Sequence, residues 1–239
     1  NAKLIKGAEV TLALTPDLEL NKKILKTVDK FWNLTPIVDT LPLNEALIKA
    51  KQSENKVVLM LARDVSGVFG EGSGYYIGLS TKGRNFANVR QYITNREEDQ
   101  LAFGMNALQD KITTIIDHSL PTSLKYLSKV KERGSFLKEK TLIIDEPTIS
   151  VYLDNSVINE IYPYKVSIVR HDEWVAAILA QKEEYCYLNI VPVPGSDQLT
   201  FMAYVMDCKG AVPYAIIRNK NDFEVMKKTI EKIIKLSRN

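Results

Sequence analysis

Cysteine and histidine are scarce in this sequence: Cys186, Cys208, His118 and His171 are the only ones among its 239 residues. No CxxC or HExxH pattern and no His/Cys cluster occurs, so a zinc or iron–sulfur site of the usual kind is not expected. Closely spaced acids of the kind that form an EF-hand loop are missing too. We therefore expect no metal and no cofactor.

Excess charge and long apolar runs are also missing. The net charge of +3 is too small to imply a polyanionic partner, so a nucleic acid is not expected. Val57–Ala62 is an apolar run of six residues, whereas a membrane-spanning helix needs about 20. Hydrophobic residues make up 45% and charged residues 26%, which is typical of a globular protein. We expect a soluble chain without a transmembrane segment.

The first residues are Asn1-Ala2-Lys3, without an initiator Met or an apolar leader. A mature exported protein begins in this way after its signal peptide is removed, and so does any chain trimmed at its N-terminus. We favour export, to the periplasm or beyond.

Hydrophobic patterning predicts the same order of elements twice. In the first half we expect strands and helices over Val10–Leu14, Leu20–Trp32, Ile37–Leu41, Glu45–Lys51, Val57–Ala62, Tyr75–Ser80 and Glu97–Asp117, with Arg84–Thr94 a loop or a further strand. In the second half we expect them over Thr141–Asp145, Tyr152–Tyr162, Val166–Val169, Glu173–Gln181, Tyr185–Val191, Leu199–Asp207, Val212–Ile217 and Asp222–Leu236. Thr15, Asn44 and Asp172 are expected to cap the helices that follow them, and Pro16 is expected at the first position of the first helix.

The spacing of the two halves agrees as well as their order. Asn44-Glu45 matches Asp172-Glu173 at an offset of 128 residues, and such a long period indicates a duplicated domain. We predict an α/β fold (α+β mixed) of two similar βαβαββ(β)α units, 1–118 and 141–239, joined by a connecting helix or linker at 119–140. Each unit has a mixed sheet flanked by helices. We expect the units to pack as a pseudo-dimer through their last, long helices.

The two cysteines lie on either side of one predicted hairpin. Its turn near Gly195–Gln198 brings Cys186 within one residue of facing Cys208. Two buried thiols are the favoured interpretation, and a disulfide is the alternative.

A glycine-rich stretch contains 5 of the 11 glycines within Gly67–Gly78. Glycines let backbone N–H groups approach an anionic or planar ligand, which makes Gly70, Gly72, Ser73, Gly74 and Tyr75 candidate ligand-binding residues. Neither the P-loop nor the GxGxxG pattern fits, and a strand rather than a helix follows. A plain hairpin tip is the alternative interpretation.

Acidic residues follow two of the predicted strands. Asp64 comes after Val57–Ala62, and Asp145 and Glu146 end Thr141–Asp145, at the carboxyl edge where α/β proteins often place functional groups. They are candidates for acid/base catalysis. His118 and His171 are interpreted as helix-cap or surface residues.

The segment Lys125–Lys140 holds six basic and two acidic residues. It is a candidate anion- or nucleic-acid-binding surface, but a solvated helix face is the favoured interpretation, because no known nucleic-acid-binding module accompanies it.

The segments KVSIVRHDEW (Lys165–Trp174) and CYLNIVPVPG (Cys186–Gly195) resemble sequence segments of uncharacterised exported proteins of Bacteroidota. The resemblance covers about the last 100 residues. It implies export and no particular activity.

The leading functional hypothesis is a non-catalytic binding or interaction protein of the cell envelope, with a protein or a small molecule as its partner. The ligand would occupy the cleft between the units, the Gly67–Gly74 loop or an exposed sheet edge. The alternatives are a hydrolase or transferase that uses carboxylates such as Asp64 or Asp145, and an anion or nucleic-acid binder.

Overall fold

The computed structural model describes residue 5 and residues 7–52, 55–63, 74–81, 84–118, 123–150, 158, 162–193, 200–210, 212–220 and 225–237. The chain forms two compact units, and the described part of the first ends at Ser123. No helix in these ranges is both long and apolar enough to cross a membrane.

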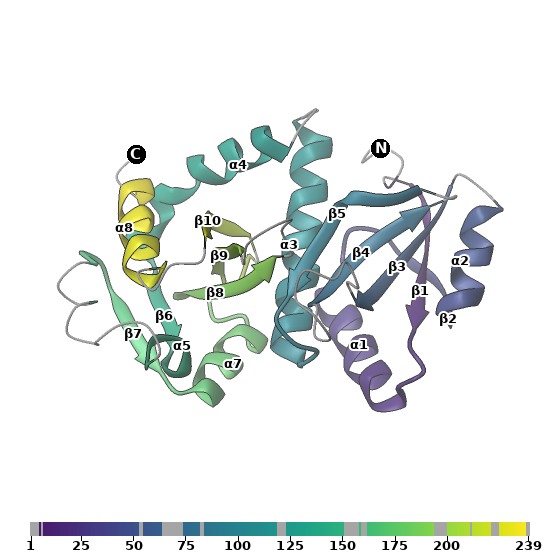
Figure 1. Cartoon of the computed structure of the whole chain (residues 1–239), viewed down its shortest axis with the longest axis horizontal. Coiled ribbons are helices and arrows are strands. Elements are labelled where there is room, and N and C mark those ends of the chain that lie inside the picture. Colours follow the sequence, from purple (N-terminus) through teal and green to yellow (C-terminus); the bar gives the residue numbers. More distant parts are fainter. Residues whose placement is uncertain are drawn as a thin grey trace. The chain divides into compact units, whose positions relative to one another are not determined.

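Within the described residues, the first unit is a five-stranded sheet with helices on both faces (Figure 1). The strand order is β2-β1-β3-β4-β5. The first three strands run parallel, and β4 and β5 are antiparallel to their neighbours. The elements are β1 (Glu9–Leu14), α1 (Leu18–Phe31), β2 (Ile37–Pro42), α2 (Leu43–Lys51), β3 (Lys56–Arg63), β4 (Tyr75–Thr81), β5 (Arg84–Ile93) and α3 (Glu98–Asp117).

The second unit repeats this topology with the order β7-β6-β8-β9-β10 among its described strands. Again β6 has a parallel neighbour on each side, and β9 and β10 complete the sheet in antiparallel fashion. The elements are α4 (Ser123–Glu132), η2 (Gly134–Glu139), β6 (Thr141–Asp145), α5 (Glu146–Ser150), β7 (Val166–Val169), α7 (His171–Leu179), β8 (Tyr185–Val193), β9 (Thr200–Asp207), β10 (Pro213–Lys220) and α8 (Val225–Ser237). The prediction of two similar mixed α/β units is confirmed.

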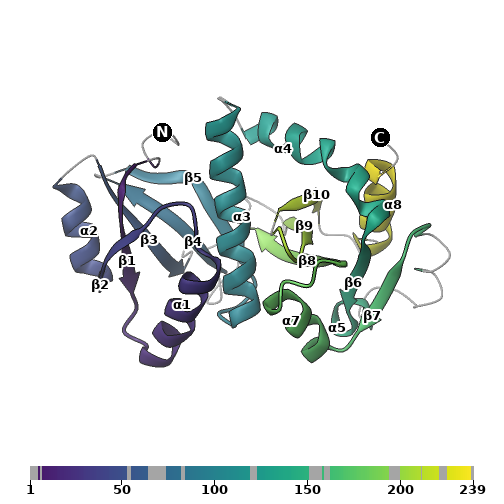
Figure 2. The ribbon, with the colours of Figure 1, turned by 180° about the vertical axis from the view of Figure 1, so that it is seen from behind.

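Small residues bring the helices of the first unit close to its sheet. Ala46 and Ala50 of α2 pack against Val58 and Met60 on one face. On the other face lies α3, and α1 packs against α3 (Figure 2). Both faces of β3 are thus covered, which explains why its sequence is apolar at consecutive positions.

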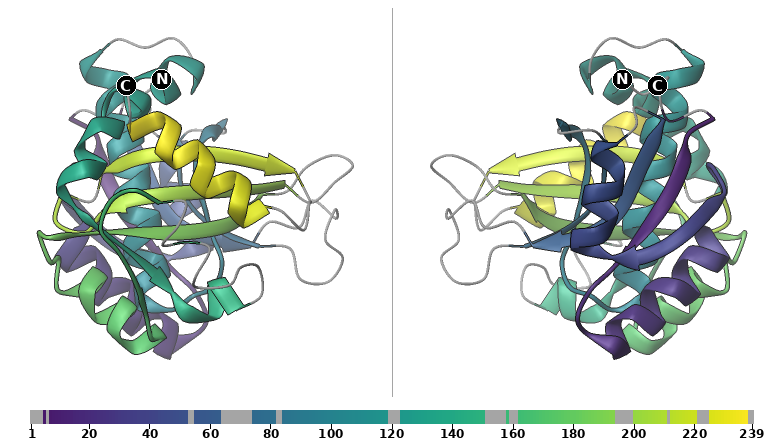
Figure 3. Two further views of the ribbon diagram at one scale, coloured as in Figure 1. Left: turned by 90° about the vertical axis from the view of Figure 1, so that its left-hand side faces the viewer. Right: turned by 90° about the vertical axis from the view of Figure 1, so that its right-hand side faces the viewer.

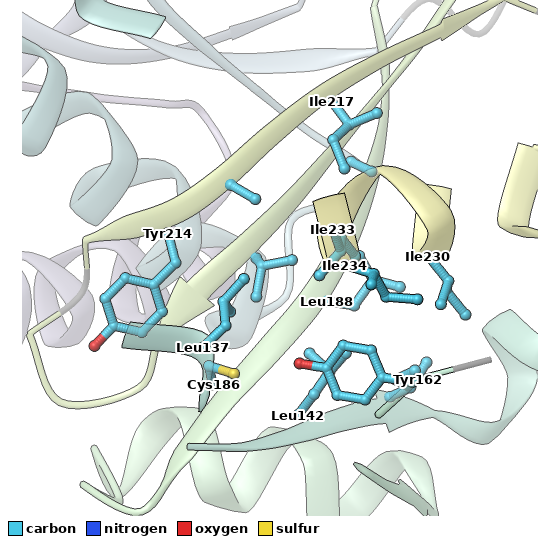
Figure 4. Packing of buried hydrophobic residues seen from close by; sticks show 14 of the residues in the cluster. Leu137, Leu142, Tyr162, Cys186, Leu188, Tyr214, Ile217, Ile230, Ile233 and Ile234 are labelled. Atoms are coloured by element: carbon cyan, nitrogen blue, oxygen red, sulfur yellow. The ribbon is translucent and has the colours of Figure 1, made fainter. Parts of the chain in front are cut away.

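The core of the second unit lies between its sheet and α8, which crosses the strands in Figure 3 (left). Ile230 and Ile233 of α8 meet Leu188 of β8 and Leu142 of β6 (Figure 4). The opposite face is covered by α7, where Trp174 meets Tyr187 edge-on with 5.5 Å between ring centres.

Both cysteines are free and buried, as the favoured interpretation expected. Cys186 pairs with Asp207 across the β8–β9 ladder, so Cys208 is one residue beyond it. Burial raises the pKa of the Cys208 thiol to about 12 and raises the pKa of Cys186 as well. The thiolate is the reactive form, so neither side chain has the features of a nucleophile.

Three helices do not begin at the residues expected to cap them. Asp17, not Thr15, caps α1, which begins at Leu18 with Pro16 outside it. The first turn of α7 already includes His171 and Asp172, and α2 begins at Leu43; neither helix has a side-chain cap. Arg84–Ile93 is a strand. The helix expected over Tyr152–Tyr162 and most of the turn expected after β8 lie outside the described residues.

Gly104 sets the distance between α3 and the sheet. A Cβ atom at this position would stand 2.7 Å from the Ile77 Cδ1 and Ile93 Cγ2 atoms. Both isoleucines are almost fully buried, so neither side chain has room to move away.

We predict that Gly104→Ala lowers the free energy of unfolding by about 1–3 kcal/mol, because overpacking a full core forces side chains and backbone to shift. Urea denaturation followed by circular dichroism measures this. Gly74→Ala is the control, because its Cβ would have 3.9 Å to the nearest heavy atom. Equal effects of the two substitutions would contradict the prediction.

Candidate functional site

The carboxyl edge of the first sheet contains a point where the chain diverges. From β1 the chain passes to β2 on one side, and from β2 it returns to β3 on the other side of β1. The connections after β1 and after β3 therefore leave in different directions. Open α/β sheets bind ligands at such switch points, outside the carboxyl ends of the strands.

A cavity of about 230 Å³ lies at this point. The segment after β1, the end of β3, the start of β4, the first turn of α1 and the connection between β5 and α3 all contribute to its lining. Among the described residues, its charged groups are two arginines and one aspartate. The lining residues are Thr15, Pro16, Asp17, Leu20, Leu61, Ala62, Arg63, Tyr75 and Arg96.

Local hydrogen bonds hold the segment from Thr15 to Asp17 in place. Asn21 accepts hydrogen bonds from the Thr15 backbone N–H (2.9 Å) and hydroxyl (3.0 Å) through Oδ1, and its Nδ2 donates to the Thr15 carbonyl (2.8 Å). The Asp17 carboxylate then accepts the Leu20 N–H at 3.0 Å and caps α1. This wall of the cavity is thereby fixed before any ligand binds.

The two arginines reach the cavity from different connections. Arg63 is the last residue of β3 and pairs with Tyr75, the first residue of β4. Arg96 lies between β5 and α3, with its guanidinium 5.3 Å from the centre of the Tyr75 ring and its Nη1 3.6 Å from the Asp17 carboxylate. Tyr75 therefore lies beside both cations.

The glycine-rich candidates are only partly accounted for. Tyr75 lines the cavity, and Gly74 precedes it at the start of β4. Gly70, Gly72 and Ser73 lie outside the described residues, and so does the catalytic candidate Asp64.

The second unit brings two sequence candidates together at the carboxyl edge of its sheet. Asp145 ends β6 and is 91% buried, and its Oδ2 lies 2.9 Å from Nδ1 of His171, the first residue of α7. The other oxygen, Oδ1, is buried and accepts no hydrogen bond from the residues that the structure describes. The imidazole is exposed and stacks on Trp174. Glu146 is exposed on α5 and does not join this pair.

The sequence did not predict Arg96 as a cavity residue, nor His171 as the partner of Asp145. Nothing local marks Arg96, since its place at the cavity depends on β4 lying between β3 and β5. For His171 a signal existed: in the parallel β6–β7 pair Asp145 faces Val169, two residues before the histidine.

In the described part of the chain, no three His, Cys, Asp or Glu side chains are grouped in a way that would hold a metal ion. The chain matched no family model, no curated protein and no solved structure.

We predict that Asp17→Ala lowers the free energy of unfolding by about 1 kcal/mol, because the Leu20 N–H loses its capping acceptor. Asp17→Asn supplies another good capping oxygen and will stay within about 0.5 kcal/mol of the native protein. Urea denaturation of the two variants tests this. A loss as large in the asparagine variant as in the alanine variant would show that charge, not capping, is what stabilises α1.

Proposed function

We propose that this protein is a non-catalytic binding protein whose first unit binds a small organic anion. The observation that carries the proposal is the cavity at the β1/β3 switch point, which two arginines line. A guanidinium offers a planar fork of donors that matches a carboxylate or phosphate group.

The rest of the lining favours an organic ligand over a bare inorganic ion. Leu20 and Leu61 are buried, and the Tyr75 ring adds an aromatic surface. At about 230 Å³ the cavity is smaller than the roughly 300–1,000 Å³ of drug-sized pockets. A small molecule with one acidic group and an apolar body fits these walls.

The basic segment Lys125–Lys140 supports a nucleic-acid partner less well than the cavity supports a small anion. Lys140 bonds to the Glu183 carbonyl and lies 3.4 Å from the Asp207 carboxylate, and Lys129 pairs with Glu132 at 2.9 Å. Internal partners therefore engage two of the six cations, which leaves a weaker field for a polyanion.

The cell envelope is part of the proposal. It rests on the resemblance of the second unit to exported proteins of Bacteroidota. Immunoblotting of cytoplasmic and envelope fractions of the source cell tests the location independently of ligand binding.

A second candidate function is acid–base catalysis at Asp145 and His171. A carboxylate accepts hydrogen bonds, so Nδ1 carries the imidazole proton and the lone pair is on Nε2. An aspartate that fixes this tautomer of an exposed histidine supplies, with that histidine, two of the three members of a hydrolytic triad. This supports the carboxylate-dependent enzyme among the sequence hypotheses, with His171 as the base.

We predict that Arg63→Gln and Arg96→Gln each weaken binding of a small carboxylate about tenfold or more. A hydrogen bond to a charged group contributes about 1.5–3 kcal/mol, and 1.4 kcal/mol corresponds to about tenfold in Kd. Ligand-observed NMR with a panel of monocarboxylates, dicarboxylates and inorganic phosphate finds the anion, and calorimetry gives Kd.

Arg90→Gln is the matched control for these variants. Its guanidinium also lies over a tyrosine of β4, 4.4 Å from the centre of the Tyr76 ring, but Arg90 does not line the cavity. The proposal fails if no small molecule with a carboxylate or phosphate group binds, or if the Arg90 variant loses as much affinity as the other two.

For the second candidate function we predict that the protein hydrolyses p-nitrophenyl acetate, and that His171→Ala reduces the rate by roughly 10²-fold, the usual contribution of a general base. Asp145→Asn will also slow the reaction, because the amide can hold the wrong tautomer. His118→Ala, at the C-cap of α3, is the control. Equal rates in the two histidine variants would exclude His171 as the base.

A further inference from the structure

The described lining of the cavity in the first unit contains one negative group beside two positive ones. Asp17 lines it together with Arg63 and Arg96, and about half of the Asp17 side chain is exposed. One carboxylate oxygen caps α1 by accepting the Leu20 N–H. The other lies 3.6 Å from Arg96 Nη1, longer than the 2.7–2.9 Å of a charge-assisted hydrogen bond. Asp17 and Arg96 are therefore only loosely paired.

This aspartate matters for the choice of ligand. A simple anion that pairs with the two arginines would lie close to the Asp17 carboxylate, which lines the same small cavity. Two negative charges at such a short separation repel each other. A ligand with a positive group next to its negative one avoids that repulsion and gives Asp17 a partner.

We propose that the ligand is a free α-amino acid with an apolar side chain. Its carboxylate pairs with Arg63 and Arg96, and its ammonium group pairs with Asp17. This inference rests on the proposed function, because it names the ligand of the same cavity.

The uncharged residues of the lining are the reason for proposing an amino acid with an apolar side chain. Leu20 and Leu61 are at most 9% exposed, and Pro16 and Ala62 complete this part of the lining. The volume of about 230 Å³ corresponds to about eight water molecules at roughly 30 Å³ each, which suits one amino acid rather than a longer peptide.

Rigidity supports the same assignment. The hydrogen bonds of Asn21 fix Thr15, the cap fixes Asp17, and the Tyr75 ring supports the Arg96 guanidinium. Discrimination between similar small ligands needs charged groups at set positions, and preorganised groups lose less freedom on binding.

The test is calorimetry on the full chain with matched pairs of ligands. Leucine, valine and phenylalanine are compared with 4-methylpentanoate, 3-methylbutanoate and 3-phenylpropanoate, which lack only the ammonium group. We expect at least one amino acid to bind about tenfold or more tighter than its matched acid. Its amide, which lacks the carboxylate charge, will bind weakly.

Asp17→Asn is the decisive variant, because asparagine also caps helices and removes only the charge. In this variant the preferred amino acid and its matched acid will bind with similar Kd. Asp29→Asn removes one exposed carboxylate from the same helix outside the cavity, and it will keep the native preference.

The outcomes separate this inference from the proposed function. If the simple acids bind as tightly as the amino acids and Asp17→Asn leaves every Kd unchanged, the cavity binds anions, but the proposal of a zwitterionic amino acid as the ligand is wrong. If neither series binds and no other anion does, both proposals fail. If a dipeptide binds more tightly than its N-terminal amino acid, the single amino acid is wrong as the ligand.

Discussion

Each unit depends on one constraint: its first strand, β1 or β6, has a parallel neighbour on both sides. Parallel pairing requires a crossover each time, so helices must cover both faces of the sheet. The same pairing sends the chain in opposite directions from the carboxyl ends of this first strand and of its later neighbour, β3 or β8. A recess at that edge follows from the strand order before any side chain is considered.

Most of this architecture was predictable because burial acts on long, regular patterns. From Val57 to Ala62 β3 is apolar at every position because both of its faces lie inside the first unit, and this signal needs no knowledge of its partners. The start of α1 was not predictable to the residue. Thr15 is an acceptable cap in isolation, but Asn21 engages its backbone and hydroxyl, which leaves Asp17 to cap the helix.

The candidate site was harder to predict than the fold for a related reason. Tyr75 was singled out through the glycines before it, yet its partners are two arginines, one near it in sequence and one beyond the next strand. A hairpin and a third strand must form before Arg63, Tyr75 and Arg96 meet. Charged residues at loop positions carry no periodic signal, because loops are not selected for regular burial.

The two units show how one fold supports different chemistry at the same edge. The interior of each sheet is restricted to apolar residues that pack, and the strand order is the same in both. The carboxyl edge is less restricted, because loop residues there need not follow a regular pattern of burial. In the first unit that edge holds Arg63 and Arg96 around a cavity, and in the second it holds the Asp145 carboxylate against the His171 imidazole. The strand order therefore determines where an edge site can form, and the residues at that edge determine which groups it presents.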